Sequence, residues 1–232
     1  MKKICFYSLV LLAVYFVISF PNVSAQNISQ LSAGKTSKTG IGFRVGLNYA
    51  KVSGKGDSIS YHYTPGLMIA VFLSPHTTGV VGYRSELLYS RQGFQYDNGK
   101  GTSGTVTNDY LMLPQMMTIN ITKFVQLQAG AFAGYLLHTK DSNAPSQSSD
   151  NNDPSAMALS LMNRIDYGAA AGIEVHPVKG LTLNARYNMG FARLYKEQSD
   201  VAQNNMSYGF NPLGNIDTKN AVLQFSVGYI FR

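Results

Sequence analysis

Cysteine is absent from the chain after Cys5, and no apolar run after residue 25 approaches the length of a membrane-spanning helix. The first absence excludes disulfides from the main part of the chain, so its fold must rest on hydrogen bonds and packing. The second excludes a further spanning helix, which needs about 20 apolar residues. Lysine-rich blocks interleaved with aromatic residues are also missing, which excludes a nucleic-acid groove. The histidines show no metal-ligand spacing; they are His62, His76, His138 and His176.

The N-terminus has the features of a secretory signal. Two lysines precede the apolar run 4–20, and small residues follow at Val23 and Ala25. This order predicts a cleaved signal peptide over residues 1–25, with a membrane anchor as the alternative. Cys5 lies well before the cleavage point, so a lipid anchor is not expected.

The charge balance is basic, but it is spread out. Removal of residues 1–25 takes two lysines from the 19 basic residues and leaves 17 against 12 acidic ones, a net charge of +5. All seven arginines lie in predicted strands or at their ends, and none lies in the long connections. The arginines therefore belong to the body of the fold. The connections hold more acids than lysines.

The last fourteen residues, KNAVLQFSVGYIFR, alternate between two faces. One face is apolar and holds Ala221, Leu223, Phe225, Val227, Tyr229 and Phe231. The other holds Val222, Gln224, Ser226, Gly228, Ile230 and Arg232. About seven other segments alternate in the same way, with Gly, Gln, Asn and Arg on the second face. The first face suits lipid, whereas the second is too polar and too small for an ordinary core. Such strands of about ten residues are typical of a transmembrane β-barrel.

The pattern predicts an all-β fold, an eight-stranded antiparallel up-and-down transmembrane β-barrel over residues 41–232. Residues 26–40 are expected to be a flexible periplasmic lead-in. The predicted strands span 41–51, 61–73, 80–93, 109–121, 124–138, 164–176, 181–194 and 219–232. Gln115 is a flaw in the pattern, because it falls on the outward face. A soluble lipocalin-like barrel is the alternative fold, and it would place the apolar face inward.

The lengths of the connections predict an orientation. The links after the second, fourth and sixth strands are short, and the other links are longer and rich in Gly, Ser, Asn and Asp. Outer-membrane barrels have short periplasmic turns and long extracellular loops. An even number of strands then places both termini in the periplasm.

Several segments resemble one known family. They are GFRVGLNYAK, YRSELLYSRQGF, DYLMLPQM, VQLQAGAFAGYLL, IDYGAAAGIEV, LTLNARYNMGF and LQFSVGYIFR. In this order they are similar to the PorT-like outer-membrane β-barrels of Bacteroidetes-type Gram-negative bacteria. The best markers are Glu86–Ser90, Tyr110–Pro114 and Ala185–Asn188. The resemblance implies an eight-stranded barrel in the outer membrane. The founding member of that family is linked to protein secretion and maturation, but no motif here transfers that role.

The predicted inward positions carry four arginines and three acids. They are Arg44, Arg84, Arg164, Arg186, Glu86, Asp166 and Glu174. Charges held away from water need partners, so these residues predict an internal salt-bridge network. An eight-stranded barrel is just wide enough to be filled by side chains. The network is expected to act as a polar plug, with a gated proton or ion path as the alternative.

The predicted outward positions include two aromatic girdles. Their members are Tyr49, Tyr61, Tyr63, Tyr89, Tyr135 and Tyr167 near the loops, with Tyr229 and Phe231 at the opposite end. Lys51, Arg91 and Arg193 lie just beyond the apolar band on the loop side. They are candidates for pairing with lipopolysaccharide phosphates, and ordinary solvation is the alternative.

These features favour a non-enzymatic barrel with a closed polar lumen and no cofactor. We expect a membrane scaffold or an accessory of secretion or surface assembly, with lipid, lipopolysaccharide and a possible protein partner as its contacts. Recognition is expected in the third and fourth loops, where Asp153-Pro154 predicts a short helix start and Tyr208 and Phe210 stand among Gly and Asn. The alternative is a lipid A-modifying enzyme, in which His62 and His138 would share a layer.

Overall fold

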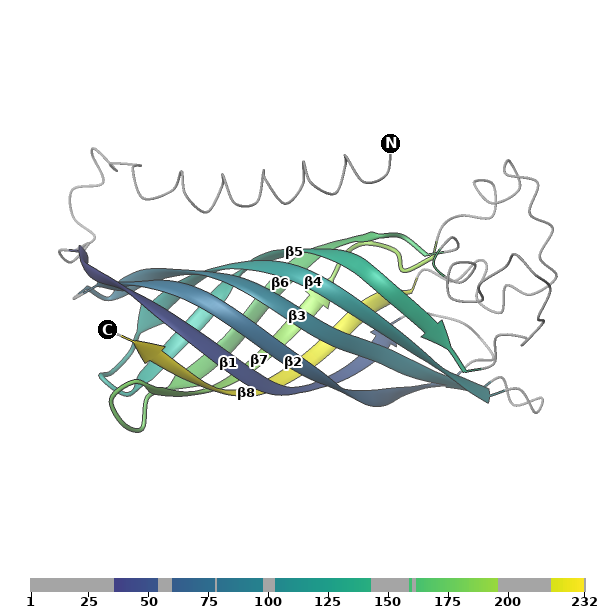
Figure 1. Cartoon of the computed structure of the whole chain (residues 1–232), viewed down its shortest axis with the longest axis horizontal. Coiled ribbons are helices and arrows are strands. Elements are labelled where there is room, and N and C mark those ends of the chain that lie inside the picture. The colour runs from purple at the N-terminus through teal and green to yellow at the C-terminus, as the bar shows by residue number, and fades with distance from the viewer. Residues whose placement is uncertain are drawn as a thin grey trace.

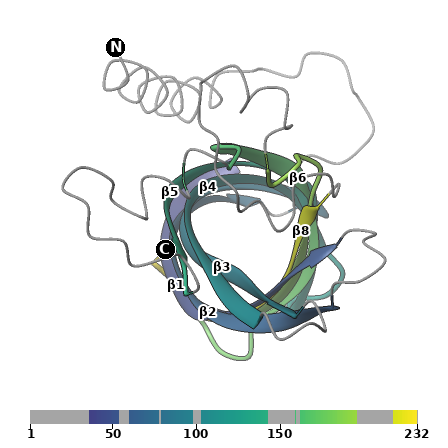
Figure 2. The same ribbon diagram turned by 90° about the vertical axis from the view of Figure 1, so that its right-hand side faces the viewer.

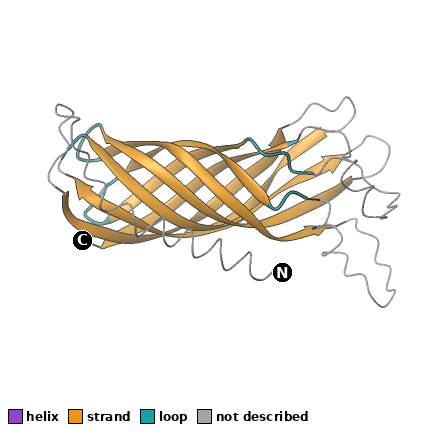
Figure 3. Cartoon of the chain, turned by 90° about the horizontal axis from the view of Figure 1, so that it is seen from above, coloured by secondary structure: helices purple, strands orange, loops and turns teal. Residues whose placement is uncertain are grey.

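A computed structural model describes residues 36–53, 60–77, 79–97, 103–142, 159, 162–195 and 218–231. The strands are β1 (Thr36–Ser53), β2 (Ser60–Thr77), β3 (Val81–Asp97), β4 (Ser103–Asn120), β5 (Val125–Asp141), β6 (Ile165–Val175), β7 (Leu181–Gly190) and β8 (Lys219–Phe231). They run as long tilted strands around one axis (Figures 1 and 3). In this part of the chain, no helix has the length and apolar character needed to cross a membrane.

The strands close into a single barrel in chain order, each antiparallel to its neighbours. Closure is made by β1 and β8, where Ile41 pairs with Phe231 and Ser53 pairs with Lys219. The view along the axis shows the resulting ring (Figure 2). The predicted eight-stranded antiparallel barrel is therefore confirmed. The predicted signal peptide lies outside the described residues.

Burial follows the two-residue period along each strand. In β8, for example, Phe225 and Val227 are exposed and Gln224 and Ser226 are buried. The exposed large apolar side chains come from every strand, including Ile41, Val45, Leu67, Ile69, Leu87, Met117, Leu127, Ile173, Leu183 and Phe225. The apolar face is thus outside, which is the reverse of what the lipocalin-like alternative requires.

Several strands are longer than their apolar pattern. β1 begins at Thr36 rather than at residue 41, so residues 36–40 of the expected lead-in are strand, and β4 begins at Ser103 rather than at residue 109. Ser103 pairs with Asp97, and Val106 pairs with Asp141. The strands continue because backbone pairing satisfies N–H and C=O groups whether or not the side chains alternate. Because these strand ends are polar, the apolar pattern of the sequence did not predict them.

The two ends of the barrel differ. Residues 78–80, 121–124 and 176–180 join the strands at one end, here called the turn side. Residues 142–164 and 191–218 make the two long connections at the other end, here called the loop side, whereas the links 54–59 and 98–102 are shorter than expected. β1 starts and β8 ends at the turn side (Figure 1). In the last turn Gly180 has a φ of 85°, and a Cβ there would also lie 2.7 Å from the ring of Tyr229.

Candidate functional site

Five buried side chains from β1, β3, β6 and β7 form one ion-pair layer inside the turn-side half of the barrel. Arg186 donates two hydrogen bonds to Glu86, at 2.8 Å (Nη1 to Oε2) and 2.9 Å (Nη2 to Oε1). Arg84 pairs with both carboxylate oxygens of Glu174, with 2.8 Å between Nη2 and Oε1. Arg44 joins the two pairs, because its Nη2 lies 2.8 Å from Glu86 and 3.4 Å from Glu174. Strands that are not neighbours are therefore tied across the interior.

Amide side chains surround this charged layer. Gln128 accepts a hydrogen bond from Arg186 at 3.0 Å and donates one to Glu174 at 3.1 Å. Asn184 donates to the same Gln128 oxygen at 3.1 Å. Gln126 accepts from Arg84 at 3.5 Å. Glu174, a layer member, thus receives hydrogen bonds from amide as well as guanidinium donors.

An aromatic ring closes one side of the layer. The guanidinium carbons of Arg44 and Arg84 lie 4.7 Å and 4.6 Å from the centre of the Phe72 ring. This is the range of cation–π attraction. A Cβ on Gly42 would lie 2.3 Å from that ring, so glycine is needed there for Phe72 to pack. Phe72 was not among the candidate residues, although its inward position follows from the alternation in β2.

The charged layer carries a surplus of positive charge. Three guanidinium groups face two carboxylates, a net +1 (3 − 2), and the side chains are at most 1 % exposed. Among the described residues, Arg44 Nε and Nη1 have no hydrogen-bond partner, and neither have Nε of Arg84 and Nε of Arg186. Loss of one carboxylate would leave more buried charge without a partner, which is strongly destabilising.

The loop-side half of the interior holds a large apolar cluster beside buried hydroxyl and amide side chains, so the lumen is not polar throughout, contrary to the expectation. The inward series on β3 changes from Arg84 and Glu86 to Leu88, and on β5 from Gln128 to Phe132. The buried side chains that pack here are Val52, Met68, Ala70, Leu88, Phe94, Val106, Tyr110, Met112, Met116, Phe132, Leu136, Met162, Ala170 and Leu194. We call this set the apolar plug. Together with the charged layer, it fills the interior.

Asp166 lies inside the barrel but apart from the charged layer. Its Oδ2 accepts a hydrogen bond from Asn220 at 2.9 Å, and Asn220 also donates to the hydroxyl of Tyr110 at 3.3 Å. Within the described residues, Asp166 Oδ1 has no hydrogen-bond partner and no cation lies within 4.0 Å of the carboxylate. The structure therefore separates this acid from the arginines expected to balance it.

The expected inward position of Arg164 is wrong. β6 begins at Ile165, one residue after Arg164, so the strand alternation does not govern this side chain. Arg164 is exposed, and its Nη1 lies 3.5 Å from the hydroxyl of Tyr135. The interior thus receives three of the four expected arginines.

Between the charged layer and the rim, Asn48 forms a smaller polar cluster that the sequence did not single out. Its Nδ2 donates to Ser90 Oγ and to the carbonyl of Arg91, both at 2.9 Å. Its Oδ1 accepts from Gln224 Nε2 at 2.9 Å. The contact joins β1, β3 and β8. Inward alternation was the signal for these residues, but it did not indicate which of them touch.

The loop-side rim cations differ in their surroundings. Lys51 lies 5.0 Å from the centre of the Tyr63 ring. Arg91 is half exposed, but it donates to both oxygens of Asp109, at 2.8 Å and 3.1 Å. Arg193 is exposed, and its carbonyl accepts from Asn163 at 2.7 Å. The charge of Arg91 is therefore largely balanced inside the chain.

The outward aromatic residues form contacts at both ends. At the turn side, Tyr229 and Phe231 pack with ring centres 4.9 Å apart. Tyr49, Tyr63 and Tyr167 are exposed, as expected. Tyr89 and Tyr135 are half-buried, and nothing is described of the side chain of Tyr61.

The flaw at Gln115 has a local explanation. Gln115 is half-buried on the outer face, where its Oε1 accepts from the hydroxyl of Tyr83 and its Nε2 donates to Ser85 Oγ at 3.0 Å. A polar group that faces lipid without a partner is costly. The three side chains satisfy one another, so the exception is compatible with an outward position.

The histidines expected for an enzymatic alternative lie on the outer surface. His62 and His138 are exposed, and His138 is the cross-strand partner of Asp109. In the described ranges, neither imidazole is hydrogen-bonded to a serine hydroxyl, and no group of three or more His, Cys, Asp or Glu side chains can hold a metal. Nothing is described of the side chain of His76. His176 lies at the turn side, with Nε2 3.2 Å from Glu174 Oε1.

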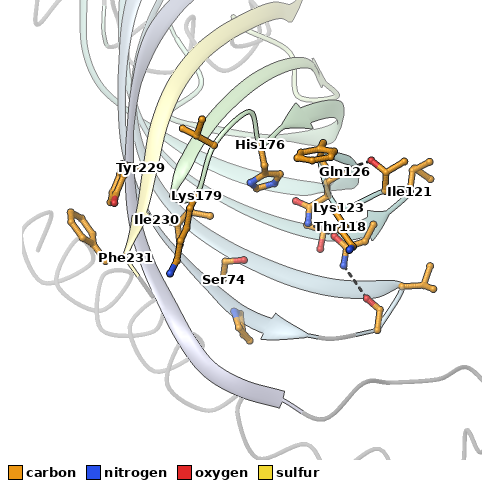
Figure 4. A pocket seen from close by; sticks show the side chains of 18 residues that line it. Ser74, Thr118, Ile121, Lys123, Gln126, His176, Lys179, Tyr229, Ile230 and Phe231 are labelled. Carbon is orange, nitrogen blue, oxygen red and sulfur yellow. Dashed lines mark hydrogen bonds between the residues drawn. The ribbon is translucent and has the colours of Figure 1, made fainter.

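A vestibule of about 1000 Å³ opens at the turn side (Figure 4). Its wall comes from the three short turns and from the ends of β2, β4, β5 and β8. Among the described residues, the lining includes Lys123, Lys179 and His176 but no acidic side chain. Below it lies the charged layer, which His176 contacts through Glu174.

The chain belongs to the family described as outer membrane protein beta-barrel domain, whose model matches residues 25–196. The fold and the outward apolar face agree with this membership, and the protein is an outer-membrane β-barrel. No curated protein matches the chain.

The comparison with solved structures finds outer-membrane barrels at low sequence identity. Neisserial surface protein A is 13% identical with a TM-score of 0.51, covering 84% of this chain and 100% of that chain. The attachment invasion locus protein Ail of Yersinia pestis is 15% identical with a TM-score of 0.45, covering 84% and 100%. OprG from Pseudomonas aeruginosa is 13% identical with a TM-score of 0.42, covering 86% and 98%.

Proposed function

We propose that this protein is a non-enzymatic outer-membrane barrel with a closed interior, which acts as a membrane scaffold or as an accessory of secretion or surface assembly. The observation that supports this most directly is the filled interior, where the charged layer and the apolar plug follow one another along the axis. A filled interior of eight strands leaves no aqueous channel. Function then depends on the outer face and the connections.

The long connections are the natural place for a partner. Residues 142–164 and 191–218 link β5 to β6 and β7 to β8 on the loop side. We assign this side to the cell exterior and the short turns to the periplasm, as is usual for such barrels. The resemblance to PorT-like barrels supports a link to secretion or surface assembly.

The test is extraction from native outer membranes in mild detergent, followed by mass spectrometry of stoichiometric partners. We expect a defined protein to co-purify with the wild type and to be lost when residues 143–158 are replaced by a short Gly-Ser linker. A linker of the same kind in place of 98–102 is the control, and it should retain the partner. A barrel that always purifies alone would reject the accessory role and leave the scaffold role.

The scaffold role includes lipopolysaccharide bound at the loop-side rim. Lys51 is a stronger candidate than Arg91, because Arg91 is already paired with Asp109. Neutralising Lys51, Arg91 and Arg193 together should lower the amount of lipopolysaccharide that co-purifies, and restoring Arg91 alone should recover little of it. Unchanged retention in the triple variant would exclude this rim as the binding site.

A further inference from the structure

The vestibule at the turn side has the charge of an anion site. Lys123 stands in the turn between β4 and β5, and Lys179 stands in the turn between β6 and β7. Both side chains are exposed, and neither ammonium group has an acidic partner within 4.0 Å in the described part of the chain. Figure 4 shows them on either side of His176. Two unpaired cations therefore face one hollow.

The floor of the vestibule adds to this charge. Glu174 is the buried acid that His176 contacts, but it is paired with Arg84 and contacted by Arg44. The whole charged layer retains a surplus of one positive charge. A cleft with low-dielectric walls and charge of one sign concentrates ions of the opposite sign. The buried surplus and the two lysines are independent features with the same sign.

The hollow also has the size and the donors that a ligand needs. Its volume of about 1000 Å³ lies at the upper end of the usual range for small-molecule pockets. Ser74 and His176 in the lining bring a hydroxyl and an imidazole. Charge-assisted hydrogen bonds to phosphate or carboxylate oxygens are the strong ones in proteins. Phe124 and Val178 add apolar wall beside the lysines.

We propose that the turn-side vestibule binds a phosphate- or carboxylate-bearing ligand between Lys123 and Lys179. The apolar plug closes the loop side, so the ligand enters only from the turn side. The side chains of segment 26–35 cannot neutralise the positive charge of the vestibule, because this segment contains Lys35 and no acid. The proposed ligand is a separate molecule, either a small solute or the headgroup of a phospholipid in the adjoining leaflet.

The test uses the full folded barrel in detergent micelles at constant ionic strength. Inorganic phosphate and succinate are titrated separately, and the signals of Lys123, Lys179 and His176 are followed by NMR. We expect saturable shifts with at least one probe. Each of K123Q and K179Q should weaken binding roughly tenfold, the effect of one lost charge-assisted hydrogen bond. K140Q removes an exposed lysine at the opposite end of the barrel and should leave the affinity within about twofold, which is under half of that free energy.

A second arm identifies the source of the anion. The same titrations are repeated in phosphatidylcholine nanodiscs, which supply headgroups but no free phosphate. If the three signals shift with lipid alone, and the shift is lost in the double variant K123Q/K179Q, the headgroup occupies the site. If they shift only with the solute, the site takes a soluble anion. Absence of any saturable shift in either arm, or an equal loss in K140Q, would overturn the proposal.

Discussion

The two halves of the barrel interior are closed by different chemistry. The turn-side half is closed by three arginines and two glutamates, and the loop-side half mainly by the apolar plug. Both halves exclude a channel, yet only one depends on exact pairing. Apolar packing tolerates changes that conserve volume, whereas a buried ion pair tolerates the loss of neither partner. The outer face is similar in both halves, because lipid surrounds both.

The largest effect is expected from breaking the charged layer. Glu174→Gln removes the carboxylate that pairs with Arg84 and contacts Arg44, and so leaves buried guanidinium charge without a counter-ion. We expect a loss of about 3–5 kcal/mol in the free energy of unfolding. A urea titration of the folded barrel in micelles measures it.

The matched control for this change is a carboxylate at the rim. Asp109→Asn removes the partner of Arg91, whose side chain is 50% exposed. Water can solvate that guanidinium, so the loss should stay below about 1 kcal/mol. If both variants lose the same free energy of unfolding, the buried charged layer is no more sensitive to the loss of a carboxylate than the exposed rim. The turn-side half would then not depend on exact pairing.

A somewhat smaller effect is expected from the apolar plug. Leu88→Ala removes a side chain with 0% exposure that packs among Met68, Met112 and other plug residues. The lost packing and the remaining cavity should cost about 2–5 kcal/mol. Leu88→Met keeps the volume and should cost less than about 1.5 kcal/mol.

Conductance in planar bilayers gives a second measurement on the same variant. The charged layer remains intact in Leu88→Ala, so we expect no channel activity. Ion currents through this variant but not through Leu88→Met would show that the plug alone keeps the barrel closed. The charged layer would then have no sealing role.

Much of the barrel was predictable from the sequence, because lipid on the outside imposes a regular pattern. The alternation in β8 predicted which residues face outward, and the structure agrees from Leu223 to Phe231. Arg44, Arg84 and Glu174 were likewise expected inside, and they are buried. Outward positions are simple to predict, because every outward side chain in the membrane contacts lipid.

The contacts inside the barrel were less predictable, because they depend on strand stagger. Arg84 and Glu174 are 90 residues apart on strands that are not neighbours, and no local pattern relates them. For the same reason, Asp166 was predicted to join a salt-bridge network with arginines that it does not contact. The prediction that Arg164 faces inward was wrong for a different reason. Arg164 lies one residue before the start of β6, where the alternation does not yet apply.

The smallest effect on the free energy of unfolding is expected at Asp166. A substitution here tests whether an inward carboxylate contributes to stability when it is not paired with the charged layer. Within the described residues, its polar contacts are neutral and no cation lies within 4.0 Å of it. Asp166→Asn keeps an oxygen that can accept from Asn220 and removes a buried charge. We expect a change of less than about 1 kcal/mol in the free energy of unfolding, or a gain in stability, because an uncompensated buried charge is itself a cost.

The comparison with Glu174→Gln separates two explanations of the interior. Both substitutions turn a buried carboxylate into an amide of similar shape, so packing changes little in either case. If pairing governs stability, Glu174→Gln is costly and Asp166→Asn is not. If burial of any inward acid in a hydrogen-bonded position is what matters, the two cost the same. A loss of about 3 kcal/mol or more in Asp166→Asn would therefore show that an ion pair is not what makes an inward carboxylate costly to lose, and that its buried, hydrogen-bonded position is enough.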